Sequence, residues 1–240
     1  MAEFSMPAGI QLGPVHLVVS DLDRATAFYG RVLGLQATPQ QRRERQLTAG
    51  DSPPLLRLTG QPDARPKPPG TTGLYHFAVL LPSRSALAAL LAHMAETGYP
   101  IRGASDHRVS EAVYLEDPDG NGIEMYADRP KDQWPKRDGE IAMATDPLDL
   151  EGLMEELEED HPWDGLPSHT RVGHIHLQVP DIVLAEAYYR DFLGFDLVTR
   201  YGSRAVFLSA GGYHHHIGLN SWAGKGAPPP PPDAVGLRSF

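Results

Sequence analysis

A sequence repeat constrains the fold of this chain more than any other feature. Residues 14–35 (PVHLVVSDLDRATAFYGRVLGL) align without a gap with residues 174–195 (HIHLQVPDIVLAEAYYRDFLGF), and the shared positions include His16 and His176. Self-similarity of this kind indicates a structural unit that occurs more than once. The fold must therefore accommodate at least two copies of one supersecondary motif.

Each copy has the pattern of a strand, a helix and further strands. An alternating apolar run comes first and predicts a strand. Asp21 or Asp181 follows, and aspartate is well suited to cap the N-terminus of a helix. Gly34 or Gly194 then ends the helical pattern. Short runs with strand character complete each copy, so both are predicted to be β-α-β-β-β modules.

A third segment with the same plan lies between the two copies. Residues 73–82 predict a strand, residues 85–99 a helix and residues 111–130 a hairpin whose turn is DPDGNG. The C-terminal residues GLRSF (236–240) resemble GLYHF at 73–77 and predict the first strand of a fourth module. We therefore expect an α+β fold of tandem modules that form cupped mixed sheets, with the fourth module apparently truncated.

Pro- and Gly-rich segments separate these units. We predict a first domain of two modules at 9–130, a linker with an acidic helix at 131–172, and an incomplete second domain at 173–240. An incomplete domain leaves a sheet edge and an apolar face exposed, which favours pairing with another chain. We therefore expect a homo-oligomer.

The composition excludes several classes of function. The chain has no cysteine, which excludes disulfide scaffolds, thiol nucleophiles and iron–sulfur clusters. Its formal net charge of −10 disfavours nucleic acid and anionic membranes as partners. Neither a signal peptide nor a transmembrane run is recognisable, so we expect a cytoplasmic protein. The 11 histidines are the main candidate metal ligands.

The motifs above resemble those of a known superfamily. The paired modules, the opening HLVVSDLDRATAFYGRVLGL and the hairpin YLEDPDGNGIEMY resemble the vicinal oxygen chelate superfamily, which includes glyoxalases, bleomycin resistance proteins and extradiol dioxygenases. More narrowly, GLYHFAVLLP and GGYHHHIGLNSW look like segments of the bacterial catechol-2,3-dioxygenases. The resemblance implies that two modules form a cupped sheet around a divalent metal. It places the ligands on the first strands of both modules and the last strand of one.

Carried over to this chain, the resemblance implies that His76 and Glu124 are metal ligands. The third ligand stays open between His16, if modules one and two pair, and His176, if modules two and three pair. Sequence order favours neighbouring modules and therefore His16. Two histidines and one carboxylate leave open coordination positions, as Fe(II) oxygenases require. We expect Fe(II), with Mn, Zn or Ni as alternatives.

Four further residues are candidates for catalytic roles. His107 precedes the hairpin, and His215 and His216 belong to a run of three histidines, so each could transfer a proton near neutral pH. Tyr126 could hydrogen-bond a bound oxygen or phenolate. The alternatives are an exposed loop position for His107, a polar segment at the protein surface for the histidine run, and packing for Tyr126.

The implied activity is extradiol cleavage of catechol-type aromatic compounds with O₂. Three other hypotheses remain open at this point. The chain could be another metalloenzyme built from the same modules, such as a glyoxalase-like isomerase or a transferase. It could be a non-catalytic protein that binds a small molecule, or an inactive fragment of an enzyme.

Overall fold

The modules predicted from the repeat are present in the computed structural model, which describes residues 4–39, 41–157 and 163–240. The first module contains β1 (Val15–Val19), α1 (Leu22–Leu33), β2 (Gln36–Ala37), β3 (Glu44–Thr48) and β4 (Leu56–Gly60). The second contains β5 (Gly73–Leu81), α2 (Arg84–Thr97), β6 (Gly103–Asp106), β7 (Ser110–Glu116) and β8 (Gly122–Asp128). The third contains β11 (Arg171–Gln178), α4 (Ile182–Ala187), a π-helical turn η2 (Tyr188–Phe192), β12 (Asp196–Tyr201), β13 (Ala205–Ser209) and β14 (Ile217–Asn220).

The segment between the second and third modules differs from its prediction. It contains a 3₁₀ turn η1 (Lys131–Gln133), the short strands β9 (Lys136–Arg137) and β10 (Glu140–Ile141), and α3 (Leu150–Met154). The acidic helix is therefore only five residues long. Glutamates at its C-terminal end oppose the helix dipole, which disfavours extension. Residues 158–162 lie outside the described part of the chain, and the division into 9–130, 131–172 and 173–240 stays a prediction.

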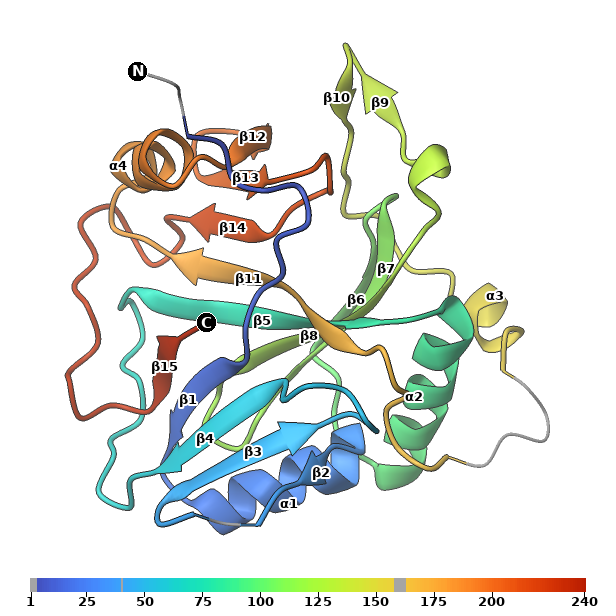
Figure 1. The fold of residues 1–240 in the computed structure, drawn as a ribbon, viewed down its shortest axis with the longest axis vertical. Coiled ribbons are helices and arrows are strands. Elements are labelled where there is room, and N and C mark those ends of the chain that lie inside the picture. The colour runs from blue at the N-terminus through green and yellow to red at the C-terminus, as the bar shows by residue number, and fades with distance from the viewer. Residues whose placement is uncertain (1–3, 40, 158–162) are drawn as a thin grey trace.

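Two main sheets arrange the modules in a way that sequence order did not suggest. A five-stranded sheet has the order β15-β1-β4-β3-β2, where β15 is Gly236–Ser239. An eight-stranded sheet has the order β12-β13-β14-β11-β5-β8-β7-β6. The second and third modules therefore share one sheet, with β11 beside β5 at its centre (Figure 1). The expected pairing of modules one and two is not what the sheets show.

The free edges of the first strands explain this arrangement. In each module the first strand pairs in parallel with the last strand, as β1 does with β4, β5 with β8 and β11 with β14. The other edge of the first strand is then available for an antiparallel partner. β15 occupies that edge of β1, and β11 occupies that edge of β5. The two pairings have the same register, because His16 faces Ser239 as His176 faces His76.

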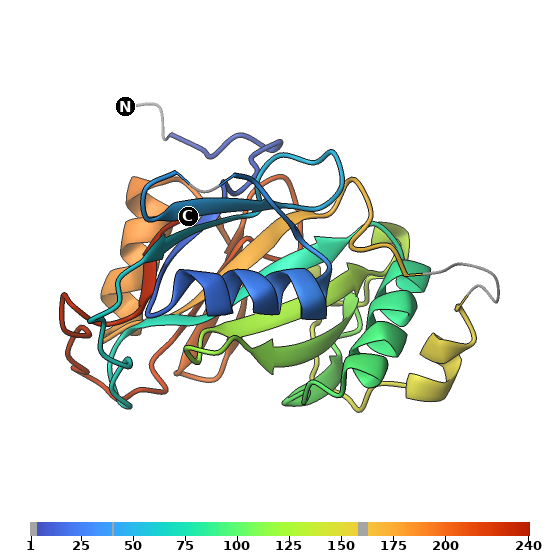
Figure 2. The same ribbon diagram turned by 90° about the horizontal axis from the view of Figure 1, so that it is seen from below.

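The helices cover the outer faces of the sheets, and α1 begins and ends where the sequence predicts, whereas α2 ends at Thr97, two residues before the predicted end. The Asp21 side chain accepts a hydrogen bond from the Arg24 amide at the start of α1, and Gly34 adopts the left-handed conformation after its end. α1 and α2 pack against each other (Figure 2). Their apolar faces and the strand faces that they cover form one continuous hydrophobic core. Among the described residues, no helix combines the length and apolar character needed to cross a membrane.

A buried turn joins the first module to the hairpin that carries β8. The Asp117 carboxylate accepts four hydrogen bonds, from the Tyr29 hydroxyl, the Asp119 amide, and the backbone and side-chain amides of Asn121. Burial raises the pKa of Asp117, although these four donors act in the opposite direction. The turn DPDGNG is therefore held by α1 of the neighbouring module as well as by its own backbone.

Replacing Tyr29 with Phe tests this connection. The variant removes the hydroxyl that donates to buried Asp117, and we expect a loss of about 2 kcal/mol in the free energy of unfolding. Urea denaturation followed by circular dichroism measures this value. Tyr99→Phe is a matched control, because the Tyr99 hydroxyl donates to a neutral backbone carbonyl, that of Glu116. We expect it to cost about 1 kcal/mol; equal losses in the two variants would contradict a special role for the Asp117 turn.

Candidate metal centre

Three potential ligands come together on neighbouring strands at the centre of the large sheet. His76 lies on β5, Glu124 on β8 and His174 on β11. In the sheet register, Ala78 of β5 lies between Glu124 on one side and His174 on the other. His76 is two residues from Ala78 and therefore on the same face. Because Ala78 is small, the longer side chains on either side can reach over it toward each other.

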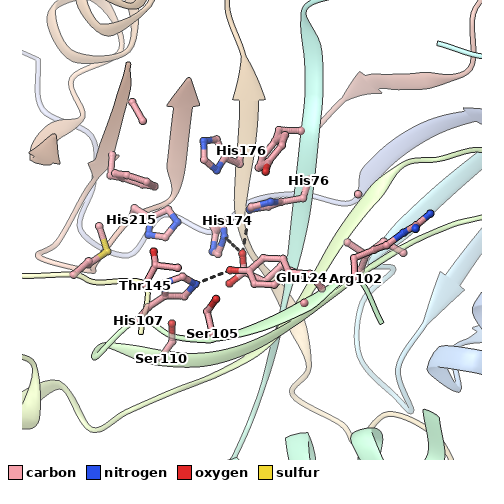
Figure 3. Close-up of a pocket in the computed structure, with 18 of the residues that line it drawn as sticks. His76, Arg102, Ser105, His107, Ser110, Glu124, Thr145, His174, His176 and His215 are labelled. Atoms are coloured by element: carbon pink, nitrogen blue, oxygen red, sulfur yellow. Dashed lines mark hydrogen bonds and ion pairs between the residues drawn. The ribbon is translucent and has the colours of Figure 1, made fainter. Parts of the chain in front are cut away.

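The three side chains are in direct contact and buried (Figure 3). Glu124 Oε2 is 3.0 Å from His76 Nε2 and accepts a hydrogen bond of 3.1 Å from His174 Nε2. The ligand atoms of all three residues lie within 4.8 Å of one another. His76 Nε2 is buried without a hydrogen-bond partner, despite its short distance to the carboxylate. A buried nitrogen lone pair of this kind fits a metal ion that the three donors would share.

The ionisation of the group also suits a metal. Burial tends to raise the pKa of Glu124, but the adjacent His174 and His76 outweigh it and hold the pKa well below its usual range. Burial lowers the pKa of His174 to about 4, and the attraction of Glu124 offsets only part of that effect. At neutral pH the site therefore holds a carboxylate and a neutral imidazole, which are the forms that coordinate metals.

A cavity of about 480 Å³ opens beside these three residues. Such a volume is sufficient for a small organic ligand. Tyr75, His176, Phe207 and Trp222 form an aromatic wall, with ring centroids 5.1 Å apart for Tyr75 and Trp222 and 5.6 Å apart for His176 and Phe207. The wall favours a flat apolar ring next to the polar group formed by the three donors.

His107 and Tyr114 form a hydrogen-bonded pair in the same cavity. His107 Nδ1 lies 2.7 Å from the Ala144 carbonyl oxygen, which accepts only, so that nitrogen carries the proton. His107 Nε2 therefore accepts the hydrogen bond of 2.6 Å from the Tyr114 hydroxyl. Burial raises the pKa of Tyr114 well above 10, and the nearby Glu124 adds to the effect. Tyr114 is thus kept as a neutral phenol beside the metal centre.

The run of three histidines divides between different environments. The expected strand begins only at Ile217, so residues 214–216 lie in the loop before β14. His215 lines the main cavity, and its ring centroid is 4.0 Å from that of His174. His216 lines a separate, smaller cavity together with residues 8–12. Its Nδ1 accepts a hydrogen bond from the Ala210 amide at 3.3 Å and lies 3.1 Å from the Ser209 hydroxyl.

Several predicted site residues lie outside the group of three. His16 is in the other sheet, where its Nε2 is 2.8 Å from the Thr59 hydroxyl, because β1 pairs with β15 and not with β5. His176 lines the cavity, but its Nε2 is 3.1 Å from the Asn220 side-chain amide, so it is not one of the clustered donors.

Tyr126 and His216 also lie outside the main cavity. Tyr126 is fully buried among Ala78, Leu80 and Ala112, and its hydroxyl is 2.8 Å from that of Tyr213. The main cavity is lined by neither Tyr126 nor His216. The alternation of β8 places Tyr126 on the same face as Glu124, but two residues further along the strand, where β11 covers it.

His174 was not predicted as a ligand, although a signal was available. It lies two residues before His176 and therefore on the same face of β11. Position 14, which aligns with it in the first copy of the repeat, is a proline. The histidines shared by the two copies thus favoured His16 and His176 over the residue that the structure places beside Glu124.

Comparisons with known proteins match the chain to one family model and to a similar relative. The model of the Glyoxalase/Bleomycin resistance protein/Dioxygenase superfamily matches residues 11–125 and 171–238. A protein of Bacillus subtilis strain 168 named catechol-2,3-dioxygenase is 50% identical over 232 residues, which are 95% of this chain and 81% of the relative.

Solved structures show the same fold at low sequence identity. A candidate dioxygenase from Bacillus subtilis strain 168 aligns with a TM-score of 0.59 at 16% identity, over 90% of this chain and 65% of the other. Glyoxalase I from Zea mays aligns with a TM-score of 0.52 at 14% identity, over 87% of this chain and 66% of the other. The chain thus spans slightly less than two thirds of these solved chains.

Enlarging Ala78 tests whether the small side chain between Glu124 and His174 is needed. We expect Ala78→Leu to push the two side chains apart and to weaken metal binding 10- to 100-fold. Anaerobic titration with Fe(II), and separately with Mn(II), measures the affinity. Val79→Ile is the control, since Val79 points from the opposite face of β5 into the core. Unchanged affinity in the Ala78 variant would show that the donors do not approach each other over this position.

The environment of His216 predicts a dependence of stability on pH. Burial lowers its pKa to about 4, whereas an unfolded histidine has a pKa of about 6.5. Between these values the unfolded chain binds a proton that the folded chain does not, so the free energy of unfolding falls as pH falls. In His216→Asn, where Oδ1 replaces Nδ1 as the acceptor, the loss between pH 7.5 and 5 should be smaller by about 2 kcal/mol. Urea denaturation at the two pH values measures the difference, and parallel losses in wild type and variant would contradict the assignment.

Proposed function

This chain belongs to the Glyoxalase/Bleomycin resistance protein/Dioxygenase superfamily, and we propose that it is an Fe(II)-dependent extradiol dioxygenase that cleaves catechol-type aromatic compounds with O₂. The observation that carries the proposal is the buried group His76, Glu124 and His174 at the wall of an aromatic-lined cavity. The relative named catechol-2,3-dioxygenase, at 50% identity, supports the same substrate class.

The composition of the group favours iron over the metals of other enzymes in the superfamily. Two histidines and one carboxylate on one face are typical of non-haem Fe(II) oxygenases, because they leave positions for a substrate and for O₂. Bound there, Fe(II) would hold both reactants and transfer charge between them. Among the described residues, the group contains a single carboxylate. The other acidic residue of the cavity wall, Glu116, is paired with Arg102. A glyoxalase-like ligand set with a second carboxylate is therefore not favoured.

The remaining side chains suit a catechol. Tyr75, Phe207 and Trp222 would contact the faces and edges of the ring and exclude water from it. The two adjacent hydroxyls would lie toward the His76, Glu124 and His174 group, because that is the polar part of the wall. Holding the ring in one orientation would select the bond beside the diol for cleavage.

Two side chains can interact with the phenolic hydroxyl groups of the substrate, His215 by accepting a proton and Tyr114 by accepting a hydrogen bond. His215 lines the cavity next to His174 and can accept a proton from a substrate hydroxyl at Nε2. Tyr114 is a neutral phenol whose own proton is donated to His107 Nε2. Its oxygen lone pairs can therefore accept a hydrogen bond from the substrate. This assigns His107 a role in orienting Tyr114, and His215 the role of general base.

Removal of single ligands tests the proposal. After anaerobic loading with Fe(II), we expect the wild-type chain to take up O₂ with catechol, and His76→Ala, Glu124→Ala and His174→Ala to lose at least 10³-fold in rate. The loss follows because two remaining donors cannot hold the ion in a facial geometry. Oxygen consumption and iron stoichiometry are measured together.

His16→Ala is the matched control, since His16 occupies in the other sheet the register position that His176 occupies in the large one. We expect it to retain both iron and oxygen uptake. Stoichiometric iron without oxygen uptake in the wild-type chain would exclude catechol as the substrate. If iron were bound equally well by all three ligand variants, the proposed metal centre would be wrong.

A further inference from the structure

A chain of three hydrogen-bonded side chains leads from the end of β8 to the cavity. His214 Nε2 is 2.9 Å from Asp128 Oδ1, and His214 Nδ1 is 2.8 Å from His215 Nδ1. Asp128 is partly exposed, with 23% of its side chain accessible, whereas His214 is completely buried. These hydrogen bonds therefore connect a carboxylate near the surface with the histidine that lines the cavity beside His174.

The carboxylate determines the direction of every hydrogen bond in this chain. A carboxylate oxygen only accepts, so a neutral His214 must donate from Nε2 and its Nδ1 carries no proton. His214 Nδ1 therefore accepts, and His215 must donate from its own Nδ1. His215 is then left with an unprotonated Nε2. That nitrogen makes no hydrogen bond in the described part of the chain, and its ring lines the main cavity.

Neighbouring groups hold the chain in place. The Tyr213 hydroxyl donates to the same oxygen of Asp128 at 3.3 Å, and the Tyr126 hydroxyl lies 2.8 Å from that of Tyr213. The His214 ring contacts both Tyr213 and Trp134, with centroid distances of 4.1 Å and 5.3 Å. Rotation of the ring would break both of its hydrogen bonds within a packed site. If the hydrogen bonds ran in the opposite direction, His214 Nε2 would carry no proton, and its lone pair would face the Asp128 carboxylate, which is repulsive.

We propose that Asp128 and His214 are positioning residues that fix His215 as the tautomer protonated at Nδ1, so that Nε2 faces the cavity as a proton acceptor. The consequence for the reaction rests on the proposed function, in which His215 takes a proton from a substrate hydroxyl. The fixed tautomer itself does not depend on that function. The proposal explains why a fully buried histidine, His214, stands next to the one that reaches the cavity.

Two nearly isosteric variants of His214 test the proposal. In His214→Asn, the amide Oδ1 takes the place of Nδ1 and can still accept from His215. In His214→Leu, a methyl group occupies that place and accepts nothing. Both variants lose the contact with Asp128 equally, so they differ in the polar amide that His214→Asn still offers to His215.

The first readout is the tautomer of His215, measured from the ¹⁵N shifts of its ring nitrogens at one fixed pH in Zn(II)-loaded, diamagnetic protein. The signals are assigned by their loss in His215→Gln. We expect the Nδ1–H tautomer in the wild type, a substantial Nε2–H population in His214→Leu, and a smaller Nε2–H population in His214→Asn. If His214→Leu does not fold, Asp128→Ala replaces it, because removal of the carboxylate allows the reversed direction.

The second readout is turnover of catechol by the Fe(II)-loaded protein. We expect kcat to fall 10²- to 10³-fold in His214→Leu with little change in KM, and to stay within about tenfold of the wild type in His214→Asn. An Nε2–H tautomer in the wild type, or one unchanged tautomer in all variants, would overturn the proposal. The expected tautomers without any turnover of catechol would support the proposal and contradict the proposed function instead.

Discussion

The antiparallel pairing of β5 with β11 is the interaction on which the site depends. It brings His174 of the third module next to Ala78 of the second, with Glu124 on the other side of the same alanine. Along the chain, His76 and His174 are 98 residues apart, and Glu124 and His174 are 50 residues apart. The three side chains meet only because of the register of β5, β8 and β11. If the pairing of one strand shifted by one residue, its ligand would point to the opposite face of the sheet.

Much of the fold followed from the repeat because its signals are local. Helix caps at Asp21 and Asp181, glycines after the helices and the DPDGNG turn all act within a few residues, and the structure has them where the sequence predicts. The partner of each module is a long-range property. A parallel pair at one edge leaves the other edge open, and the sequence does not state which strand fills it. His16 was preferred as a ligand because the sequence does not show that β11, and not β1, pairs with β5.

The site shows why residues shared by the two copies were a poor guide to the ligands. Positions that agree between two copies of a module are those that the common frame requires, and His16 and His176 each make a hydrogen bond within their own sheet, to Thr59 and Asn220. Chemistry present in only one copy must come from positions where the copies differ. Proline at 14 and histidine at 174 are such a pair. His76 and Glu124, by contrast, were predicted, because His76 lies in the motif GLYHF at 73–77 and Glu124 in the hairpin motif, and both motifs resemble those of the superfamily.

The matching registers of β1 with β15 and of β11 with β5 have an evolutionary consequence. The five-stranded sheet repeats the frame of the large one, but Pro14 and Ser239 stand where the frame would present His174 and His76. Duplication supplied two equivalent frames, and one of them is sufficient for a ligand set. In the described residues the other sheet presents no such ligand set, yet its module still contributes a structural contact, the hydrogen bond from Tyr29 to the turn beside β8. We therefore expect divergence between the two copies to be asymmetric, with more substitutions of polar pocket residues in the copy without the ligand set.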